Sequence, residues 1–203
     1  MSSTTTTWIF GYGSLVSPSS LASTIGRTVS VGHGMHIAEL ADYRRAWNYG
    51  SEVLRGDWID DAGVQTIGGL VVSLGIVAAP GDSINGVVFA VDDDELADLD
   101  WRERAYDRID ITDRITLIDR SASVRLDDPV AVYVPRPAAI ARYEHHRDNG
   151  TAGIRRSYWD IVDAAFTDLG AHHAEWYRRT PAPDVPVVDI TLVPLPARRP
   201  RSR

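Results

Sequence analysis

The segment from Asp92 to Arg104 carries a carboxylate on what we predict to be the inward side of a helix. Leu96, Leu99 and Glu103 are spaced at i, i+3 and i+7, which places them on one helical face, while Arg102 and Arg104 are expected to point elsewhere. A buried carboxylate costs free energy unless it is paired, hydrogen-bonded or protonated, and burial raises its pKa toward the ~6–7 that suits proton transfer near neutrality. Glu103 is therefore a candidate general acid–base residue. The arginines that offer the alternative, a structural ion pair, are Arg44, Arg45 and Arg108.

A second candidate is the glycine-bearing turn that follows the apolar run at residues 8–10. Glycine at positions 11 and 13 permits unusual φ angles and close approach of the backbone to a ligand. Successive N–H groups in such a turn can converge on a carboxylate or phosphate, and a helix that starts just after it adds positive potential. The alternative is a simple structural turn. The predicted substrate-binding residues are Gly11, Tyr12, Gly13, Ser14 and Leu15.

Other patterns argue against several common site chemistries. The turn lacks the third glycine of a dinucleotide fingerprint, and Ser14 is outside the Gly-x-Ser-x-Gly frame of an esterase elbow. Adjacent histidines on a helix do not face one another, so the pairs at 145–146 and 172–173 predict surface positions. Asp92 to Asp94 are expected to cap a helix start. The sequence therefore predicts no metal site, and a nucleotide-binding or phosphate-transfer protein is poorly supported.

The composition narrows the chemistry further. All 21 basic residues are arginine, and lysine and cysteine are absent. This excludes a Schiff-base or P-loop lysine, a cysteine nucleophile and a disulfide. The net charge of -7 argues against nucleic acid and anionic membranes as partners, so the aromatic and arginine-rich run at residues 43–56 is expected to line a pocket or pack in a sheet. No apolar run approaches the ~20 residues of a membrane span, the first residues do not resemble a signal peptide, and we expect a cytoplasmic protein.

The elements that must position these residues are predicted from length and periodicity. The 203 residues are expected to form one domain, 1–203, with flexible tails at 1–7 and 194–203. Ser17 and Pro18 predict a helix start, and residues 58–68 a polar loop. Strands come in runs and helices gather late, which indicates an α+β fold. Strands are expected at 8–10, 29–49, 70–77, 84–91, 106–118, 130–134 and 187–192, with a turn at 79–82, and further helices at 92–104, 137–147 and 153–179.

Two of these segments together resemble the gamma-glutamylcyclotransferase-like superfamily. Residues 10–15, Phe-Gly-Tyr-Gly-Ser-Leu, resemble its signature turn, and residues 99–108 resemble the segment that carries its essential glutamate, which falls on Glu103. Residues 43–56 and 150–158 look like segments of the ChaC-type, glutathione-specific branch, whereas 95–111 look equally like the AIG2-like branch. Two departures concern the substrate: Arg155 stands where ChaC-type members usually have asparagine, and the loop at 57–68 differs from the usual continuation.

The resemblance implies a small mixed β-barrel with flanking helices, and a reaction that needs no cofactor or metal. In that reaction the α-amine of a γ-glutamyl group attacks its own γ-carbonyl, forming 5-oxoproline and releasing an amine or peptide. The turn at Gly11–Leu15 would hold the α-carboxylate and Glu103 would move the protons. The candidate substrates are glutathione, γ-glutamyl amino acids and γ-glutamyl amines. The alternative is a binding module that holds such a ligand without turnover.

Overall fold

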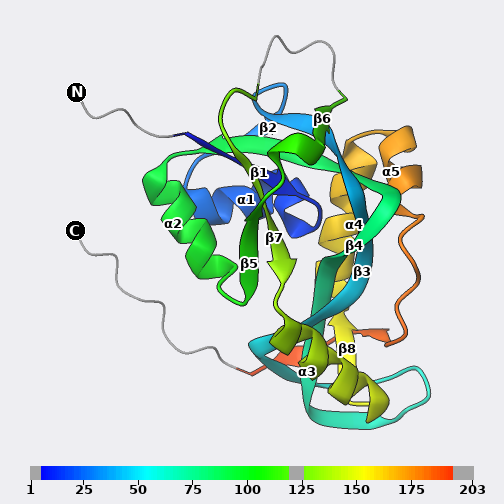
Figure 1. Cartoon of the computed structure of the whole chain (residues 1–203). Coiled ribbons are helices and arrows are strands. Elements are labelled where there is room, and N and C mark those ends of the chain that lie inside the picture. Colours follow the sequence, from blue (N-terminus) through cyan, green and yellow to red (C-terminus); the bar gives the residue numbers. More distant parts are fainter. Residues whose placement is uncertain (1–5, 119–125, 194–203) are drawn as a thin grey trace.

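The computed structural model describes residues 6–118 and 126–193, which contain one ten-stranded mixed sheet and five α-helices (Figure 1). The strands are β1 (Thr7–Gly11), β2 (Ser30–Val31), β3 (Gly34–Ile59), β4 (Gln65–Val91), β5 (Tyr106–Asp110), β6 (Ile115–Leu117), β7 (Val130–Pro135), β8 (Ala152–Arg155), β9 (Val187–Val188) and β10 (Thr191–Leu192). The helices are α1 (Pro18–Ile25), α2 (Asp93–Arg102), α3 (Pro137–Asp148), α4 (Arg156–Asp168) and α5 (Ala171–Tyr177), with 3-10 turns η1 (Ser14–Val16) and η2 (Thr112–Arg114). The α+β class is confirmed.

The sheet is open in the part of the chain that is described. Its main path runs β10-β3-β4-β1-β7-β5, with β2 and β6 pairing with β3, and β8 lying between β4 and β9. The strands at the two ends of this path, β10 and β5, pair only with their single neighbours, so the expected barrel closure is not observed. β1 is central: it pairs antiparallel with β4 and parallel with β7.

β3 and β4 form a long hairpin that is the largest part of the sheet. The turn predicted at 79–82 is wrong, because these residues lie within β4. β4 is continuous over 27 residues. Instead of ending the strand, the segment 79–82 forms an irregularity in its pairing, opposite Asp42 on β3. Asp42 has φ of 64° and its carboxylate accepts a hydrogen bond from the N–H of Gly81 at 3.0 Å. Such bulges bend a strand without ending it. The predicted loop at 58–68 is largely the tip of this hairpin, where Trp58 pairs with Thr66.

The helix starts predicted at Pro18 and at Asp92 are confirmed in detail. Pro18 opens α1, and the Ser17 hydroxyl accepts from the N–H of Ser20. At α2 a capping box forms, in which the Asp92 carboxylate accepts from the N–H of Glu95 at 2.9 Å and the Glu95 carboxylate accepts from the N–H of Asp92 at 3.2 Å. Side-chain oxygens at these positions satisfy the free N–H groups of the first turn.

Two predicted elements are divided in the structure. The helix expected at 153–179 is three elements, β8, α4 and α5, because residues 152–155 join the sheet beside β4 and Gly170, with φ of 107°, separates the two helices. The strand expected at 106–118 is divided by η2, since its first half pairs with β7 and its second half with β3. In both cases pairing with distant strands overrides the local pattern.

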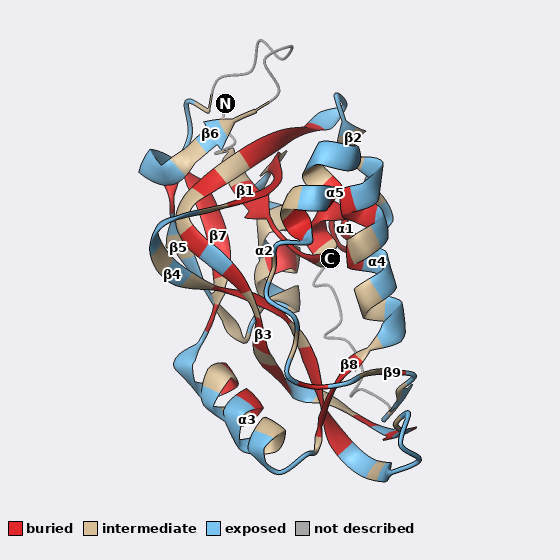
Figure 2. Ribbon diagram, turned by 90° about the vertical axis from the view of Figure 1, so that its right-hand side faces the viewer, coloured by how far each residue is buried: buried red, intermediate tan, exposed pale blue. Residues whose placement is uncertain are grey.

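The core lies along the central strands, and exposed residues gather on the outer faces of the helices (Figure 2). Ile9 and Phe10 of β1 and Phe89 of β4 are almost fully buried. The N-terminal tail predicted at 1–7 is shorter than expected, because Thr7 already pairs with Val91 in the sheet. Residues 1–5 and the predicted tail at 194–203 lie outside the described residues. No helix of the described segments has the length and apolar character needed to cross a membrane.

Candidate active site

A cleft of about 510 Å³ opens between α1, the end of α2, the middle of β3 and the start of α4. A narrow recess of about 30 Å³, large enough for roughly one water molecule or one small polar group, adjoins it. The side chains that line both spaces are Ser14, Glu103, Tyr106 and Tyr158. The two sequence candidates, the glycine-bearing turn and the glutamate, are therefore brought together at one place.

The turn connects the end of β1 to the 3-10 turn η1, and the residues from Tyr12 to Leu15 line the recess. The first N–H groups of any helix have no intrahelical acceptor, so those of Ser14 and Leu15 are not used by η1 itself. Both residues line the recess, and so does Glu103. This arrangement can bind an anionic or carbonyl oxygen close to a carboxylate.

Gly11, the first of the predicted turn residues, does not line the recess and has a packing role instead. A Cβ atom at this position would lie 2.9 Å from the Cβ of Leu15 and 3.2 Å from its carbonyl carbon. Contacts below 3.0 Å force the backbone to shift. The glycine is thus what allows η1 to fold back onto the end of β1.

We expect Gly11→Ala to lower the free energy of unfolding by about 1–3 kcal/mol, the usual cost of overpacking a rigid site. Urea unfolding of the purified variant measures this. Gly13→Ala is the matched control, because its Cβ would lie 3.3 Å from the Tyr158 hydroxyl and no closer than 3.8 Å to the Leu74 side chain. Equal stability of the wild type and Gly11→Ala would show that the turn can relax around a methyl group.

The buried side chain of Arg45 holds the backbone of the turn by hydrogen bonds. The Arg45 side chain, on a residue that is 1% exposed, donates from Nε to the Tyr12 carbonyl at 3.0 Å, and from Nη2 to the carbonyl of Asn85 and to its Oδ1, the latter at 3.1 Å. Its guanidinium carbon lies 4.6 Å from the centre of the Phe166 ring. On the other side the Tyr12 hydroxyl donates to the Tyr133 carbonyl at 2.8 Å. Burial lowers the pKa of Arg45.

Sequence reasoning did not single out Arg45 as a support for the turn, although a signal was present. Strand residues alternate between faces, so Tyr43, Arg45 and Trp47 share a side of β3, and all three are buried. An arginine between two aromatic residues on the inward face of a strand needs carbonyl or carboxylate partners. The same run lines the cleft with Tyr49 and residues 51–54, so both expectations for residues 43–56, pocket lining and sheet packing, are confirmed.

Glu103 faces inward, but for a different reason than its helical spacing suggested. α2 ends at Arg102, and Glu103 is its C-terminal cap, with its N–H donating to the Leu99 carbonyl at 2.8 Å. Adjacent residues on a continuing helix do not face one another. Because the helix ends here, the Arg102 Nε reaches Glu103 Oε1 at 2.9 Å. The prediction that Arg102 points elsewhere is therefore wrong.

The arginines proposed as structural partners of Glu103 are engaged elsewhere. Arg108 pairs with Asp100 at 3.1 Å, Arg44 lies 4.0 Å from Asp82, and Arg45 holds the turn. Within the described segments, the second carboxylate oxygen of Glu103, Oε2, has no hydrogen-bond or ion-pair partner. One oxygen is thus held by arginine while the other is available to a ligand.

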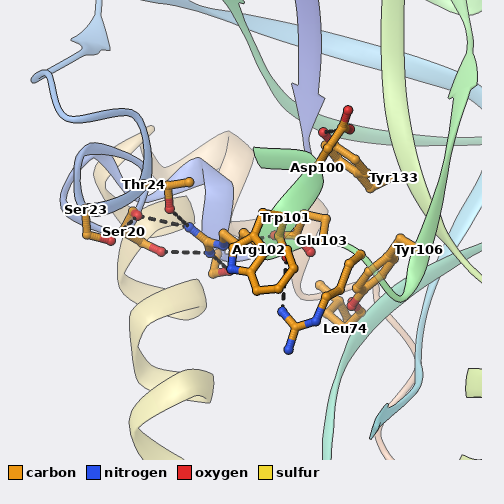
Figure 3. A network of polar contacts seen from close by, with 12 residues as sticks. Ser20, Ser23, Thr24, Leu74, Asp100, Trp101, Arg102, Glu103, Tyr106 and Tyr133 are labelled. Atoms are coloured by element: carbon orange, nitrogen blue, oxygen red, sulfur yellow. Dashed lines mark hydrogen bonds and ion pairs between the residues drawn. The ribbon is translucent and has the colours of Figure 1, made fainter. Parts of the chain in front are cut away.

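Arg102 connects the carboxylate to helix α1 and to the turn (Figure 3). Its Nη1 donates to the Ser20 carbonyl at 3.0 Å and to Thr24 Oγ1 at 2.8 Å. Its Nη2 donates to Ser14 Oγ at 2.9 Å and to Ser20 Oγ at 3.1 Å. With Nε on Glu103, the guanidinium is fully used by the protein. It fixes the distance between the carboxylate and the turn.

The electrostatics of the recess favour proton transfer by the carboxylate. Burial raises the pKa of Glu103, because only 15% of its side chain is exposed, and the charge and hydrogen bond of Arg102 act in the opposite direction. Burial also raises the pKa of Tyr12 and Tyr106 well above the usual value, and that of Tyr158 to about 12. The tyrosines around Glu103 therefore stay neutral hydroxyls at physiological pH.

The histidine pairs lie at or near the surface. His145 and His172 are exposed, while His146 and His173 are half-buried. In residues 6–118 and 126–193, no group of three histidine or carboxylate side chains is placed to hold a metal ion.

No protein-family model matches the sequence, and no curated protein matches it. Among solved structures, one named gamma-glutamyl cyclotransferase aligns with a TM-score of 0.52 and 16% identity over 88% of this chain and 89% of its own. The uncharacterized protein loc79017 from Homo sapiens aligns with a TM-score of 0.51 and 17% identity over the same shares of the two chains. YkqA from Bacillus subtilis aligns with a TM-score of 0.52 and 13% identity over 86% of this chain and 53% of its own. Sequence identities this low support only a similarity of fold. The chain has a gamma-glutamyl cyclotransferase-like fold.

Proposed function

We propose that this protein is a gamma-glutamyl cyclotransferase that converts a γ-glutamyl compound into 5-oxoproline and a free amine or peptide. The observation that carries the proposal is the placement of Glu103, whose carboxylate has a raised pKa and lines the same narrow recess as Ser14 and Leu15 of the turn, with one oxygen that has no partner among the described residues. The fold agrees with the proposal. The chemistry requires no cofactor or metal.

In this proposal the turn holds the near end of the substrate. The N–H groups of Ser14 and Leu15 bind the α-carboxylate at the recess, and the adjoining part of the cleft accepts the rest of the folded-back γ-glutamyl group. The wider cleft accepts the leaving amine. Ring closure is intramolecular, so holding the α-amine near the γ-carbonyl carbon supplies much of the rate enhancement.

Glu103 carries the protons between the two nitrogens of the substrate. The α-ammonium must lose a proton before it can attack, and it loses a second one as the new C–N bond forms. The γ-amide nitrogen gains two protons as its bond to the carbonyl carbon breaks and it leaves as an ammonium. Proton gain and loss balance, so one carboxylate acting first as base and then as acid returns to its starting form.

The test is incubation of the purified protein with glutathione, γ-glutamyl amino acids and γ-glutamyl amines, read by mass spectrometry for 5-oxoproline and the released amine together. Equimolar appearance of both products supports the proposal. Tight binding of these compounds with no product would instead identify the binding module considered above. Neither binding nor turnover of any γ-glutamyl compound would contradict both.

Removal of Arg102 is expected to shift the pH dependence of the reaction. Glu103 must be deprotonated to act first as a base, so kcat/KM falls as the pH drops through its pKa. Arg102 opposes the rise in that pKa that burial causes. In Arg102→Met the pKa rises further, and the acid limb of the kcat/KM profile moves to higher pH, with a lower plateau because the tether to the turn is lost.

Arg104→Met is the control for this experiment. Arg104 is the neighbouring cation of the same cleft, but its guanidinium stacks on the Trp101 ring, 4.9 Å from the ring centre. Its removal should leave the acid limb in place. A lower rate in Arg102→Met with an unmoved acid limb would assign Arg102 a purely structural role.

A further inference from the structure

One cation that lines the cleft has no hydrogen-bond or ion-pair partner in the described part of the chain. The charged residues that line it, besides Glu103, are Glu52, Arg102, Arg104 and Arg155. The N–H groups of the Arg102 guanidinium all donate to the turn, to α1 or to Glu103. Arg104 lies over the Trp101 ring and donates to the Trp101 carbonyl at 3.1 Å. The Arg155 side chain has no hydrogen-bond or ion-pair partner among the described residues.

The backbone fixes Arg155 at the wall of the cleft. It is the last residue of β8, pairs with Val188 of β9, and directly precedes α4. The next residue, Arg156, has the same side chain but a different environment, since it donates to the Val187 carbonyl at 2.8 Å and lies 4.0 Å from Asp189. Of the two adjacent arginines, only Arg155 lines the cleft.

Arg155 is half-buried, and a guanidinium in such a position without a partner favours an anion. Glu52 lines the same cleft, but it is exposed and forms no ion pair within the described residues, so it does not neutralise Arg155. The α-carboxylate of a γ-glutamyl substrate is assigned to the turn, at the recess, which Arg155 does not line. An anion that pairs with Arg155 would therefore lie at the other end of the substrate.

We propose that Arg155 binds a carboxylate on the leaving amine, so that the protein acts on γ-glutamyl amino acids and peptides in preference to simple γ-glutamyl amines. This inference rests on the proposed function. Arginine suits the role because its planar fork can donate two parallel hydrogen bonds to a carboxylate. Arg155 is thus a specificity-determining residue of the wider cleft.

The experiment compares γ-glutamylalanine with γ-glutamylethylamine, which differ only in the carboxylate of the leaving group. The wild type should show a kcat/KM about ten to a hundred times higher for γ-glutamylalanine, the range expected of a hydrogen-bonded charge pair. Arg155→Gln should remove this preference by lowering kcat/KM for γ-glutamylalanine alone, and Arg155→Lys should restore part of it. Arg156→Gln is the matched control and should keep the full preference.

Three results would overturn the assignment: a wild type with no preference for γ-glutamylalanine, an Arg155→Gln variant that keeps the preference, or one that loses activity equally on both compounds. If the wild type turns over neither these two compounds nor glutathione or any other γ-glutamyl compound, the proposed function fails, and calorimetric binding of the same pair decides the assignment separately. A preference in dissociation constant that Arg155→Gln removes supports it. Equal binding of both compounds by the wild type overturns it.

Discussion

Replacement of Glu103 by glutamine is expected to lower the rate of 5-oxoproline formation by roughly 10²–10⁴-fold, the range that general acid–base groups contribute. The amide has nearly the shape of the carboxylate, and its oxygen can still accept the hydrogen bond from Arg102 Nε. It cannot take a proton from the α-ammonium near neutral pH. Single-turnover kinetics with excess enzyme, followed by mass spectrometry of 5-oxoproline, measures the loss without interference from product release.

Glu52→Gln is the matched control, because Glu52 lines the same cleft but not the recess. It should keep the wild-type rate on γ-glutamyl amines. Glu103→Gln should also still bind substrate, since the turn and Arg155 are untouched, and its thermal unfolding should be close to that of the wild type. Full activity of Glu103→Gln would remove the proposed mechanism.

The features predicted correctly from the sequence depend on neighbouring residues. The caps at Ser17 and Asp92 are decided within four residues, and a glycine turn after a buried strand is equally local. The encounter of this turn with Glu103, some ninety positions later, was expected only through the resemblance to a family. Periodicity alone placed Glu103 inward but on a continuing helix. On such a helix Glu103 could not have paired with its neighbour Arg102.

The features missed from the sequence depend on distant contacts. Arg102 meets Ser14 and Ser20 across more than eighty positions, and nothing in its own segment indicates this. The continuous β4 was predicted as two strands, because a Pro-Gly sequence normally marks a turn. Its pairing with β3 across a bulge overrides that local preference. Likewise the open edges of the sheet follow from strand pairing that residue patterns do not determine.

The largest loss of stability is expected for Arg45→Met, at about 2–5 kcal/mol in the free energy of unfolding. Methionine fills a similar volume but leaves the buried carbonyls of Tyr12 and Asn85 without their donor, at about 1–3 kcal/mol for each. The contact with the Phe166 ring is lost as well. Removal of a buried charge offsets part of this cost, because burial already disfavours the charged form of Arg45 and lowers its pKa.

Urea unfolding of Arg45→Met, compared with Arg44→Met, decides whether the lost hydrogen bonds or the removed cost of burying the charge contributes more to stability. The Arg44 side chain is 57% exposed and should change stability by no more than about 0.5 kcal/mol. Arg45→Lys keeps the charge but cannot reach both carbonyls with one fork, so it should lie between the wild type and Arg45→Met. If Arg45→Met were as stable as the wild type, the desolvation of the guanidinium would equal its hydrogen bonds. The arginine would then serve only to hold the Tyr12 carbonyl in place, and its loss would lower activity without lowering stability.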